Sequence, residues 1–352
     1  MTLYSQIAHL PIIFKCERGA SLRLEGSLLS SSLSFRNIIV ASGRGVSRTI
    51  ADRVVTGLLG CNVENVIVSA NSEAEVARLH DVAERRAADL VIGVGGGRVN
   101  DVCKRLSRLH HLNYLYIPTV VSNDGLMSPI SVLKDEEGLT QSLPGAMPMG
   151  ILIDLDIVMS APEKYLRAAA GDLLSNLSAI NDWKFAAAHF GHRMNDVALH
   201  MAEQAAISGL QSNSHDLGNE RFVAQVVGGQ VFSGIAMALA GSSRPCSGSE
   251  HLISHAIDYL GRDLLALHGE QVGSISLFTL WLQGELRQAH LDYAHNLGLN
   301  PYFPNLVGIQ ESDTMEIFQA SRKVRPGRRT VLDRYEDEQL CSKLIEFRRS
   351  IA

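Results

Sequence analysis

Short apolar segments alternate with segments of helical periodicity over the first half of the chain. The apolar segments predict strands at 37–41, 65–68, 89–94, 114–118 and 151–154. At 47–59 and 76–88 apolar residues recur every three or four positions, which predicts amphipathic helices between the strands. Strands that alternate with helices form a parallel, doubly wound sheet, so we expect this half to be an α/β domain.

Beyond Pro162 the pattern changes to long, Ala-rich segments with apolar residues at helical spacing. They predict helices at 164–188, 195–210, 219–240, 249–266, 271–290 and 335–350. A turn is expected near Arg262, and the stretch 321–331, rich in Arg, Gly and Pro, predicts a loop. A chain of 352 residues is long enough for two domains. We therefore expect an α/β domain at 1–160 and an all-α domain at 161–352.

The composition is that of a globular protein without a large charge imbalance. Hydrophobic residues make up 46% of the chain, and the net charge of -5 argues against nucleic acid as a partner. A short basic cluster is expected to be a solvated face and comprises Arg322, Lys323, Arg325, Arg328 and Arg329. Dispersed cysteines, the lack of a signal-peptide pattern and the lack of a long apolar run predict a cytoplasmic protein without a membrane span. A homo-oligomer is the default expectation for a soluble protein of this kind.

A glycine-rich turn follows the strand predicted at 89–94. It consists of Gly95, Gly96 and Gly97 and leads into a predicted helix that begins with Arg98, Val99, Asn100 and Asp101. Glycines let a ligand approach the backbone, and the free N–H groups of a helix N-terminus favour an anion. The spacing differs from GxGxxG, but consecutive glycines are costly for a turn alone. We interpret the segment as a phosphate-binding site, and a tight turn without ligand is the alternative.

Lys104 is a candidate catalytic residue near this turn. It lies three residues after Asp101, on the same face of the predicted helix. A surface ion pair between the two side chains is an equally good interpretation of this spacing.

Small hydroxyl residues surround one acid in the loop after the strand predicted at 114–118. The loop includes Thr119, Val120, Val121, Ser122, Asp124 and Ser128. Ligands of open α/β sheets bind beyond the carboxyl ends of the strands, so this loop and the glycine turn are expected at one edge. Hydroxyls suit hydrogen bonds to a dinucleotide, and Asp124 could accept one from a substrate hydroxyl. The alternative is a capped turn at Asp124-Gly125.

Histidines and a carboxylate in the second half have the spacing of a metal site. His251 and His255 are four residues apart and so share one helix face, and His268 opens the next helix. Asp172 lies in an apolar, Ala-rich helix, where a buried acid needs a partner. Two imidazoles and a carboxylate suit Zn²⁺, Fe²⁺ or Ni²⁺ acting as a Lewis acid. A purely structural histidine pair is the alternative, and spacing alone leaves open which histidine of the pair is the ligand.

Five motifs occur together and in order along the chain. They are Gly95-Gly96-Gly97-x-x-x-Asp101; Pro118-Thr119-x-x-Ser122-x-Asp124-Gly125-x-x-Ser128-Pro129; Gly171-Asp172-x-x-x-Asn176; Ser247-Gly248-Ser249-Glu250-His251-x-x-x-His255; and His268-Gly269-Glu270. In this combination the chain resembles the sn-glycerol-1-phosphate dehydrogenase family, within the superfamily of iron-containing alcohol dehydrogenases, glycerol dehydrogenases and dehydroquinate synthases. The resemblance runs from about residue 35 to 290. It implies a Rossmann-like N-terminal domain followed by an all-α C-terminal domain, which is the dehydroquinate synthase-like fold.

For the metal, the resemblance implies Asp172, His251 and His268 as ligands. Asn176 stands where several iron-dependent relatives have a fourth ligand histidine, so a centre with three protein ligands is implied. The implied metal is Zn²⁺, with Ni²⁺ or Fe²⁺ as alternatives.

For the substrate, the resemblance implies contacts with His255, Asp124 and the metal-bound Asp172. The dinucleotide would lie on 97–101 and 119–122, with Ser128 near the nicotinamide end. The implied reaction is the reduction of dihydroxyacetone phosphate to sn-glycerol 1-phosphate by NAD(P)H.

Two residues depart from the family pattern close to the expected chemistry. Arg98 replaces a usual Lys, which keeps the charge but changes the hydrogen-bond geometry, and Asn123 replaces a usual His. Because of these departures, a different small phosphorylated or polyhydroxylated ketone is the alternative substrate. A cyclase resembling dehydroquinate synthase is a second hypothesis, which would call for more Lys and Arg at the site. An inactive regulator is a third, and it would not need the Asp, His and His set.

On this interpretation the metal polarises the substrate carbonyl, and NAD(P)H delivers a hydride to its carbon. His255, or a water molecule that it holds, is expected to relay a proton, because imidazole titrates near neutral pH. The first strand ends in Ser42-Gly43 without an acid for the adenosine 2′-hydroxyl, so NADPH is expected to serve as readily as NADH.

Overall fold

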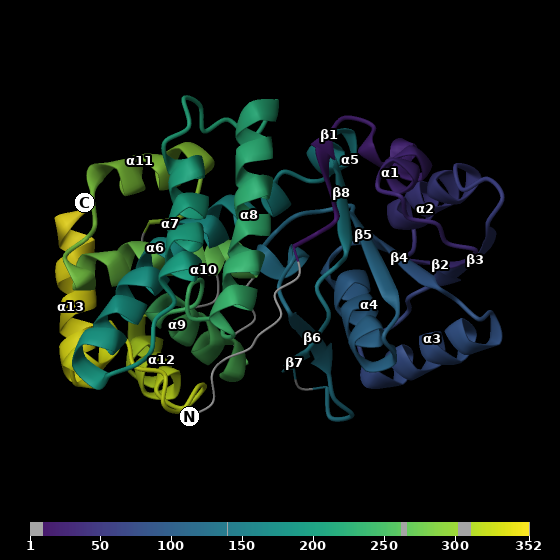
Figure 1. The fold of residues 1–352 in the computed structure, drawn as a ribbon. Helices are drawn as coiled ribbons and strands as arrows, with labels where there is room; N and C mark the ends of the chain where they lie inside the picture. Colours follow the sequence, from purple (N-terminus) through teal and green to yellow (C-terminus); the bar gives the residue numbers. More distant parts are fainter. Residues whose placement is uncertain (1–9, 139, 262–265, 302–310, 352) are drawn as a thin grey trace. The chain divides into compact units, whose positions relative to one another are not determined.

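The computed structural model describes residues 10–138, 140–261, 266–301 and 311–351 (Figure 1). The chain divides into two compact units. The sheet unit holds residues 10–121 and 125–162, and the helical unit holds the residues from Glu163 onward together with Ser122–Asp124. The division at Glu163 falls close to the boundary expected at 160.

The sheet unit is built on parallel strands in one six-stranded sheet. In spatial order they are β1 (Ile13–Glu17), β8 (Gly150–Asp154), β5 (Asn113–Pro118), β4 (Leu90–Gly95), β2 (Asn37–Ser42) and β3 (Asn62–Ile67). The predicted parallel sheet is confirmed, and each predicted strand overlaps an observed one. β1 was not predicted because only its first residue, Ile13, is buried, so this edge strand lacks an apolar run.

Helices cover both faces of this sheet (Figure 1). On one face lie α1 (Leu24–Ser30) and α2 (Val46–Thr56), and on the other lie α3 (Glu73–Arg85) and α4 (Gly97–His110). Side chains of successive strand residues point to opposite faces, and both Ile38 and Ile39 of β2 are buried. A strand buried on both sides has a continuous apolar run in its sequence, as expected of a parallel sheet. The unit also contains β6 (Ile130–Lys134), β7 (Thr140–Pro144) and α5 (Leu155–Ser160).

The carboxyl ends of β2, β4 and β5 meet at one edge of the sheet. Gly95 is paired with Pro118, and Ser42 is paired with Val94. The Thr119 N–H also donates to the Gly95 carbonyl oxygen at 3.0 Å. The glycine turn and the loop after β5 therefore share this edge, as predicted.

The described part of the helical unit is composed mainly of helices. They are α6 (Lys164–Phe190), α7 (Asp196–Leu210), α8 (Glu220–Ala240), α9 (Ser249–Tyr259), α10 (His268–Gln283), α11 (Gln288–Leu297), α12 (Thr314–Ser321) and α13 (Asp337–Ser350). The single helix predicted at 271–290 is wrong, because Gly284, with φ 76°, ends α10 before α11 begins. The helix predicted at 249–266 ends at Tyr259, and the turn expected at Arg262 lies outside the described residues. The loop predicted at 321–331 connects α12 to the short helix η4 (Val331–Arg334).

Among the helices that the structure describes, one, α8, is long and apolar enough to cross a membrane by length and composition. However, 72% of its most apolar window is buried within the protein, where it packs against α7 and α6. Core helices of globular proteins meet the same criterion, because a helix that is apolar all round is a buried helix.

Candidate metal centre and nucleotide-binding edge

A close crossing of α6 and α10 positions the candidate metal ligands. Gly171 of α6 lies directly against the Gly269 carbonyl of α10, and a Cβ atom at Gly273 would lie 2.6 Å from the Gly171 Cα atom. Backbones can approach this closely only where side chains are missing. The crossing brings Asp172, the neighbour of Gly171, beside His268, the first residue of α10.

Asp172, His251 and His268 converge in the helical unit. Each offers one ligand atom, and these atoms all lie within 4.8 Å of one another. Within the described part of the chain this group does not include His255. The structure thus brings together the same three residues that the resemblance implied as ligands, while metal binding by them remains a prediction.

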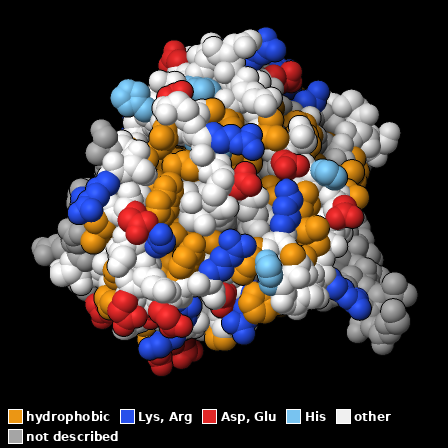
Figure 2. All heavy atoms as spheres, turned by 90° about the vertical axis from the view of Figure 1, so that its left-hand side faces the viewer, with side chains coloured by type: hydrophobic (Ala, Val, Ile, Leu, Met, Phe, Trp, Pro, Cys, Tyr) orange, Lys and Arg blue, Asp and Glu red, His pale blue; other side chains and the backbone are white. Residues whose placement is uncertain are grey.

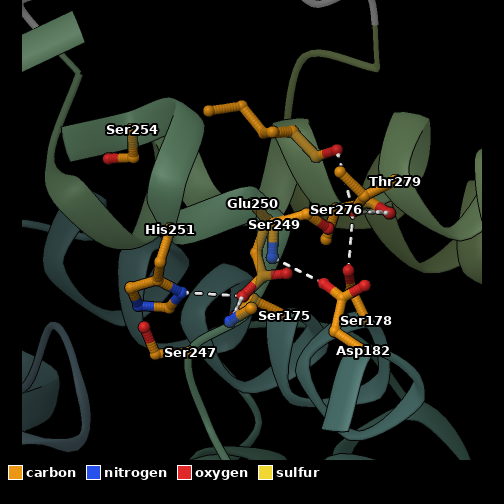
Figure 3. A network of polar contacts seen from close by, with 12 residues as sticks. Ser175, Ser178, Asp182, Ser247, Ser249, Glu250, His251, Ser254, Ser276 and Thr279 are labelled. Carbon is orange, nitrogen blue, oxygen red and sulfur yellow. Dashed lines mark hydrogen bonds and ion pairs between the residues drawn. The ribbon is translucent and has the colours of Figure 1, made fainter. Parts of the chain in front are cut away.

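Hydrogen bonds on the far side of both imidazole rings orient them. Glu250 Oε1 lies 2.9 Å from Nδ1 of His251 (Figure 3), and Ser254 Oγ lies 3.3 Å from Nδ1 of His268. These contacts leave Nε2 of each ring for a ligand, and such partners are typical of metal-binding histidines. The roles of Glu250 and Ser254 were not predicted, although an acid next to His251 in an apolar helix is a signal visible in the sequence.

Burial determines the charge of the three candidate ligands. It lowers the pKa of His251 to about 3, with a smaller contribution from two nearby arginines, and lowers the pKa of His268 to about 3 as well. Both rings are therefore neutral at pH 7, which is the form that binds a metal. Burial, followed by the neighbouring Asp124 carboxylate, raises the pKa of Asp172 well above its usual range. A divalent cation would offset the cost of this buried charge, so the donor set fits such an ion.

A second buried carboxylate, Asp182 of α6, connects α9 to the segment after α12. Its Oδ2 atom accepts a hydrogen bond from the Ser249 N–H at 2.6 Å (Figure 3), and its Oδ1 atom accepts one from the Val331 N–H at 2.7 Å. Ser249 begins α9 and Val331 begins η4, so the carboxylate lies at two helix N-termini. Burial and the Glu250 carboxylate nevertheless raise the pKa of Asp182 to about 7.

Asp124 and His255 lie at the margin of the ligand group. The Asp124 N–H donates to Asp172 Oδ2 at 3.0 Å, and His255 Nε2 accepts from the Arg325 guanidinium at 3.1 Å. Burial, followed by Arg325 and other neighbours, lowers the pKa of His255 to about 2. The expectation that His255 titrates near neutral pH is therefore wrong, because the neutral ring is the stable form.

The glycine turn begins α4 as predicted, with Gly96 at the N-cap and Gly97 as the first helical residue. A Cβ atom at Gly95 would lie 2.6 Å from Val99 Cγ2. One at Gly96 would lie 2.9 Å from Val120 Cγ2, whereas one at Gly97 would meet open space. None of the three has a positive φ, so packing requires the first two, a reason that the sequence alone does not reveal. The open space at Gly97 fits a phosphate approaching the helix N-terminus.

The other predicted cofactor residues lie along the same edge of the sheet unit or follow it in the chain. Thr119 Oγ1 lies 3.2 Å from Ser47 Oγ, which adds a hydroxyl that sequence analysis missed. The Asn100 amide donates to the Gly125 carbonyl oxygen at 2.7 Å and so holds the loop. Exposure varies among the rest: Arg98 is exposed, Val120 and Ser122 are half-buried, and Val99, Val121 and Ser128 are buried.

Lys104 is completely buried, with 0% of its surface exposed. Its Nζ atom lies 3.4 Å from Asp101 Oδ1 and donates to the carbonyl oxygens of Gly125, at 3.0 Å, and of Ile130. It also contacts Ser128 Oγ at 3.3 Å. The expected ion pair with Asp101 is therefore present, but the expectation that it lies at the surface is wrong because Lys104 is buried. Its ammonium group holds the loop after β5 against α4. A catalytic role for Lys104 remains a prediction.

The basic cluster near the C-terminus is only partly solvated. Arg322, Lys323 and Arg329 are exposed, as predicted. The prediction is wrong for Arg325 and Arg328, which turn inward and donate to the hydroxyls and backbone of the loop before α9. On the face of the molecule drawn in Figure 2, Lys and Arg side chains are interspersed with Asp and Glu. Arg325 and Arg328, by contrast, place two positive charges side by side at the loop before α9.

Comparisons with known proteins agree with this geometry. The family model of iron-containing alcohol dehydrogenases matches residues 15–162. A glycerol-1-phosphate dehydrogenase (NAD(P)+) from Thermofilum pendens is 34% identical over 340 residues, which cover 96% of this chain and 97% of the relative. The chain belongs to the glycerol-1-phosphate dehydrogenase family.

Another glycerol-1-phosphate dehydrogenase, from Thermoplasma acidophilum, is 35% identical over 301 residues and 84% of each chain. Among solved structures, a probable glycerol dehydrogenase from Sinorhizobium meliloti 1021 superposes with a TM-score of 0.75 at 18% identity, covering 97% of this chain and 98% of that one. This similarity shows a shared fold. The predicted family and the predicted fold class are both confirmed.

Proposed function

We propose that this chain reduces dihydroxyacetone phosphate to sn-glycerol 1-phosphate with NAD(P)H and one divalent metal ion. The observation that carries the proposal is the convergence of Asp172, His251 and His268 within 4.8 Å. It occurs in a chain that is 34% identical to a glycerol-1-phosphate dehydrogenase over 96% of its length. Neutral imidazoles and a buried carboxylate form a donor set of the kind that activates a carbonyl group.

The three residues hold the cation, for which Zn²⁺ is the proposed identity. Catalytic zinc sites use two imidazoles and a carboxylate and keep a position open for substrate. When bound, the ion supplies Lewis-acid polarisation of the ketone. Glu250 and Ser254 contribute by keeping each Nε2 atom directed at the ion. Ni²⁺ and Fe²⁺ also accept imidazole ligands and are the alternatives.

Asp124 and His255 complete the substrate site. The half-buried Asp124 carboxylate accepts a hydrogen bond from a substrate hydroxyl, while its N–H fixes Asp172. Because Arg325 donates to Nε2 of His255, the ring proton of the neutral imidazole resides on Nδ1. That N–H is the group from which the neutral His255 ring donates a hydrogen bond to the substrate.

The dinucleotide binds at the edge formed by the carboxyl ends of β2, β4 and β5. Its phosphates lie at the N-terminus of α4, where Gly97 leaves open space. The hydroxyls of Ser47 and Thr119 are placed to bind the nucleotide's polar groups. NAD(P)H supplies the hydride of the reduction.

The test is oxidation of NADPH and NADH, followed by absorbance with dihydroxyacetone phosphate, after chelation and after addition of Zn²⁺ or Ni²⁺. We expect chelation to abolish turnover and metal to restore it. His268→Ala should stay inactive with every metal, whereas His295→Ala, at an exposed histidine of α11, should behave as wild type. Turnover by metal-free protein would refute the metal's role, and no oxidation with any metal would refute the substrate.

A further inference from the structure

Two arginines in the segment between α12 and η4 turn inward toward α9. Arg325 donates to Ser243 Oγ at 3.0 Å, to Ser247 Oγ at 3.3 Å and to His255 Nε2 at 3.1 Å. Arg328 donates to Ser243 Oγ at 2.9 Å and to the Ser247 carbonyl oxygen. All of these acceptors are neutral groups.

In the part of the chain that the structure describes, the arginine pair forms no direct ion pair with an acid, and the charges of the Glu250 and Asp182 carboxylates only partly offset the lowered pKa of Arg328. Among the residues that the structure describes, no carboxylate lies within ion-pair distance of Arg325 or Arg328, whereas their neighbour Arg329 pairs with Asp333 at 2.9 Å. Burial, followed by the charges of Arg325 and Arg244, lowers the pKa of Arg328 to about 9. Two like charges held together away from water are costly unless an anion joins them.

A cavity adjoins the arginine pair. It has a volume of about 210 Å³, and its lining includes Arg325 and Arg328, the further arginines Arg322 and Arg329, one acid, Asp333, and the uncharged Leu252, Gly327 and Thr330. Each guanidinium carries five N–H donors, and the described contacts use only some of them. Planar guanidinium groups with spare donors match the geometry of a phosphate group, which they bind through paired hydrogen bonds.

The arginine pair is close to the candidate metal centre. Arg325 contacts His255, and the ring of His255 lies 6.1 Å from that of His251 and 5.8 Å from that of His268, centroid to centroid. In dihydroxyacetone phosphate only three bonds separate the carbonyl carbon from phosphorus. A small phosphorylated ketone therefore holds its carbonyl group and its phosphate close together, and Arg325 is likewise separated from the ligand group only by the ring of His255.

We propose that Arg325 and Arg328 bind the phosphate group of the substrate and so select phosphorylated ketones. The inference rests on the proposed function, because it deepens the assignment of the same site. Ser243 and Ser247 position the guanidinium groups, and the substrate dianion neutralises them. Unphosphorylated dihydroxyacetone lacks this anchor and is a poor substrate.

The test compares Arg328→Met with Lys323→Met, which removes an exposed charge from the same basic cluster. Both are assayed with dihydroxyacetone phosphate and with dihydroxyacetone. For Arg328→Met we expect kcat/KM to fall by about 100-fold with the phosphorylated substrate and to change less than about threefold with the other. Lys323→Met should match wild type with both. An equal loss with both substrates, or no loss, would overturn the proposal.

A binding measurement separates this inference from the proposed function. Inorganic phosphate is titrated against metal-free full-length protein, so that no metal can hold the anion, and the thermal midpoint is followed. Phosphate should raise the midpoint of wild type and Lys323→Met but not that of Arg328→Met or of Arg325→Met. Equal shifts in all four proteins, or none in wild type, would overturn the phosphate site. A phosphate effect without turnover would leave the site standing and remove the dehydrogenase assignment. Circular dichroism of each variant checks that it folds.

Discussion

One added methyl group at the glycine contact between α6 and α10 is expected to lower both the stability of the protein and its affinity for Zn²⁺. In Gly273→Ala the new Cβ atom would lie 2.6 Å from the Gly171 Cα atom, whereas ordinary contact begins at 3.4 Å. The obstacle is backbone, so no side-chain rotation relieves it, and the helices must separate by about 0.8 Å. Asp172 follows Gly171 directly, so this separation also moves Asp172 away from His268.

Two free-energy terms determine the stability of this variant. Overpacking of a well-packed core lowers the free energy of unfolding by about 1–3 kcal/mol. Replacing glycine with alanine inside a helix raises it by about 1 kcal/mol. The net loss of up to about 2 kcal/mol should lower the thermal midpoint by up to about 8 °C. Metal sites tolerate changes of only about 0.2 Å in ligand distance, so Zn²⁺ affinity should fall by about 10–100-fold.

Gly228→Ala on α8 is the matched control, because a Cβ atom there meets nothing within 4 Å. This variant should gain up to about 1 kcal/mol of stability, because alanine is more favourable than glycine inside a helix, and its Zn²⁺ affinity should be unchanged. The assays are thermal unfolding of the metal-free protein and competition for Zn²⁺ with a coloured chelator. If Gly273→Ala matched Gly228→Ala in both assays, the helix crossing would not be what positions the ligands.

Three further predictions concern the same sites. Glu250→Gln should weaken Zn²⁺ binding about 10-fold or more in the chelator assay, because the Nδ1 partner of His251 loses its charge; unchanged affinity would contradict its orienting role. Folding raises the pKa of Asp182 to about 7, so its protonation stabilises the protein below about pH 4, and this contribution is lost as pH rises through 7. The thermal midpoint between pH 5 and 8 should therefore fall less steeply in Asp182→Asn than in wild type, and equal slopes would count against the raised pKa. Because β2 ends at Ser42 without an acid, kcat/KM for NADPH and NADH should agree within about tenfold, and a larger preference for NADH would require another ribose contact.

The central strands could be predicted from sequence because burial on both faces removes polar residues from them. β4 (Leu90–Gly95) is buried at every position, so it stands out as one apolar run. β1 lies at the edge of the sheet and mixes Lys15 and Glu17 with apolar residues, which hides it. The break between α10 and α11 was missed because both helices are apolar on their buried sides, and one glycine is a weak signal.

The candidate site was predictable only where its residues are close in sequence or share a family motif. Spacing alone left His251 and His255 equivalent, and the resemblance was needed to choose between them. Arg325 lies 70 residues from its contact His255, and no local pattern connects the two. A basic stretch rich in Gly and Pro is typical of an exposed loop. That Arg325 and Arg328 turn inward is therefore visible only in the folded structure.

The two oxygens of Asp182 have a consequence for substrate selection. One oxygen accepts from Ser249 at the start of α9, the helix that carries His251. The other accepts from Val331, which directly follows the segment that carries Arg325 and Arg328. A single rigid carboxylate thereby sets the span between the ligand group and the arginine pair. If the arginine pair binds the substrate phosphate, a ketone whose phosphate lies one carbon farther from its carbonyl group should fit this fixed arrangement less well.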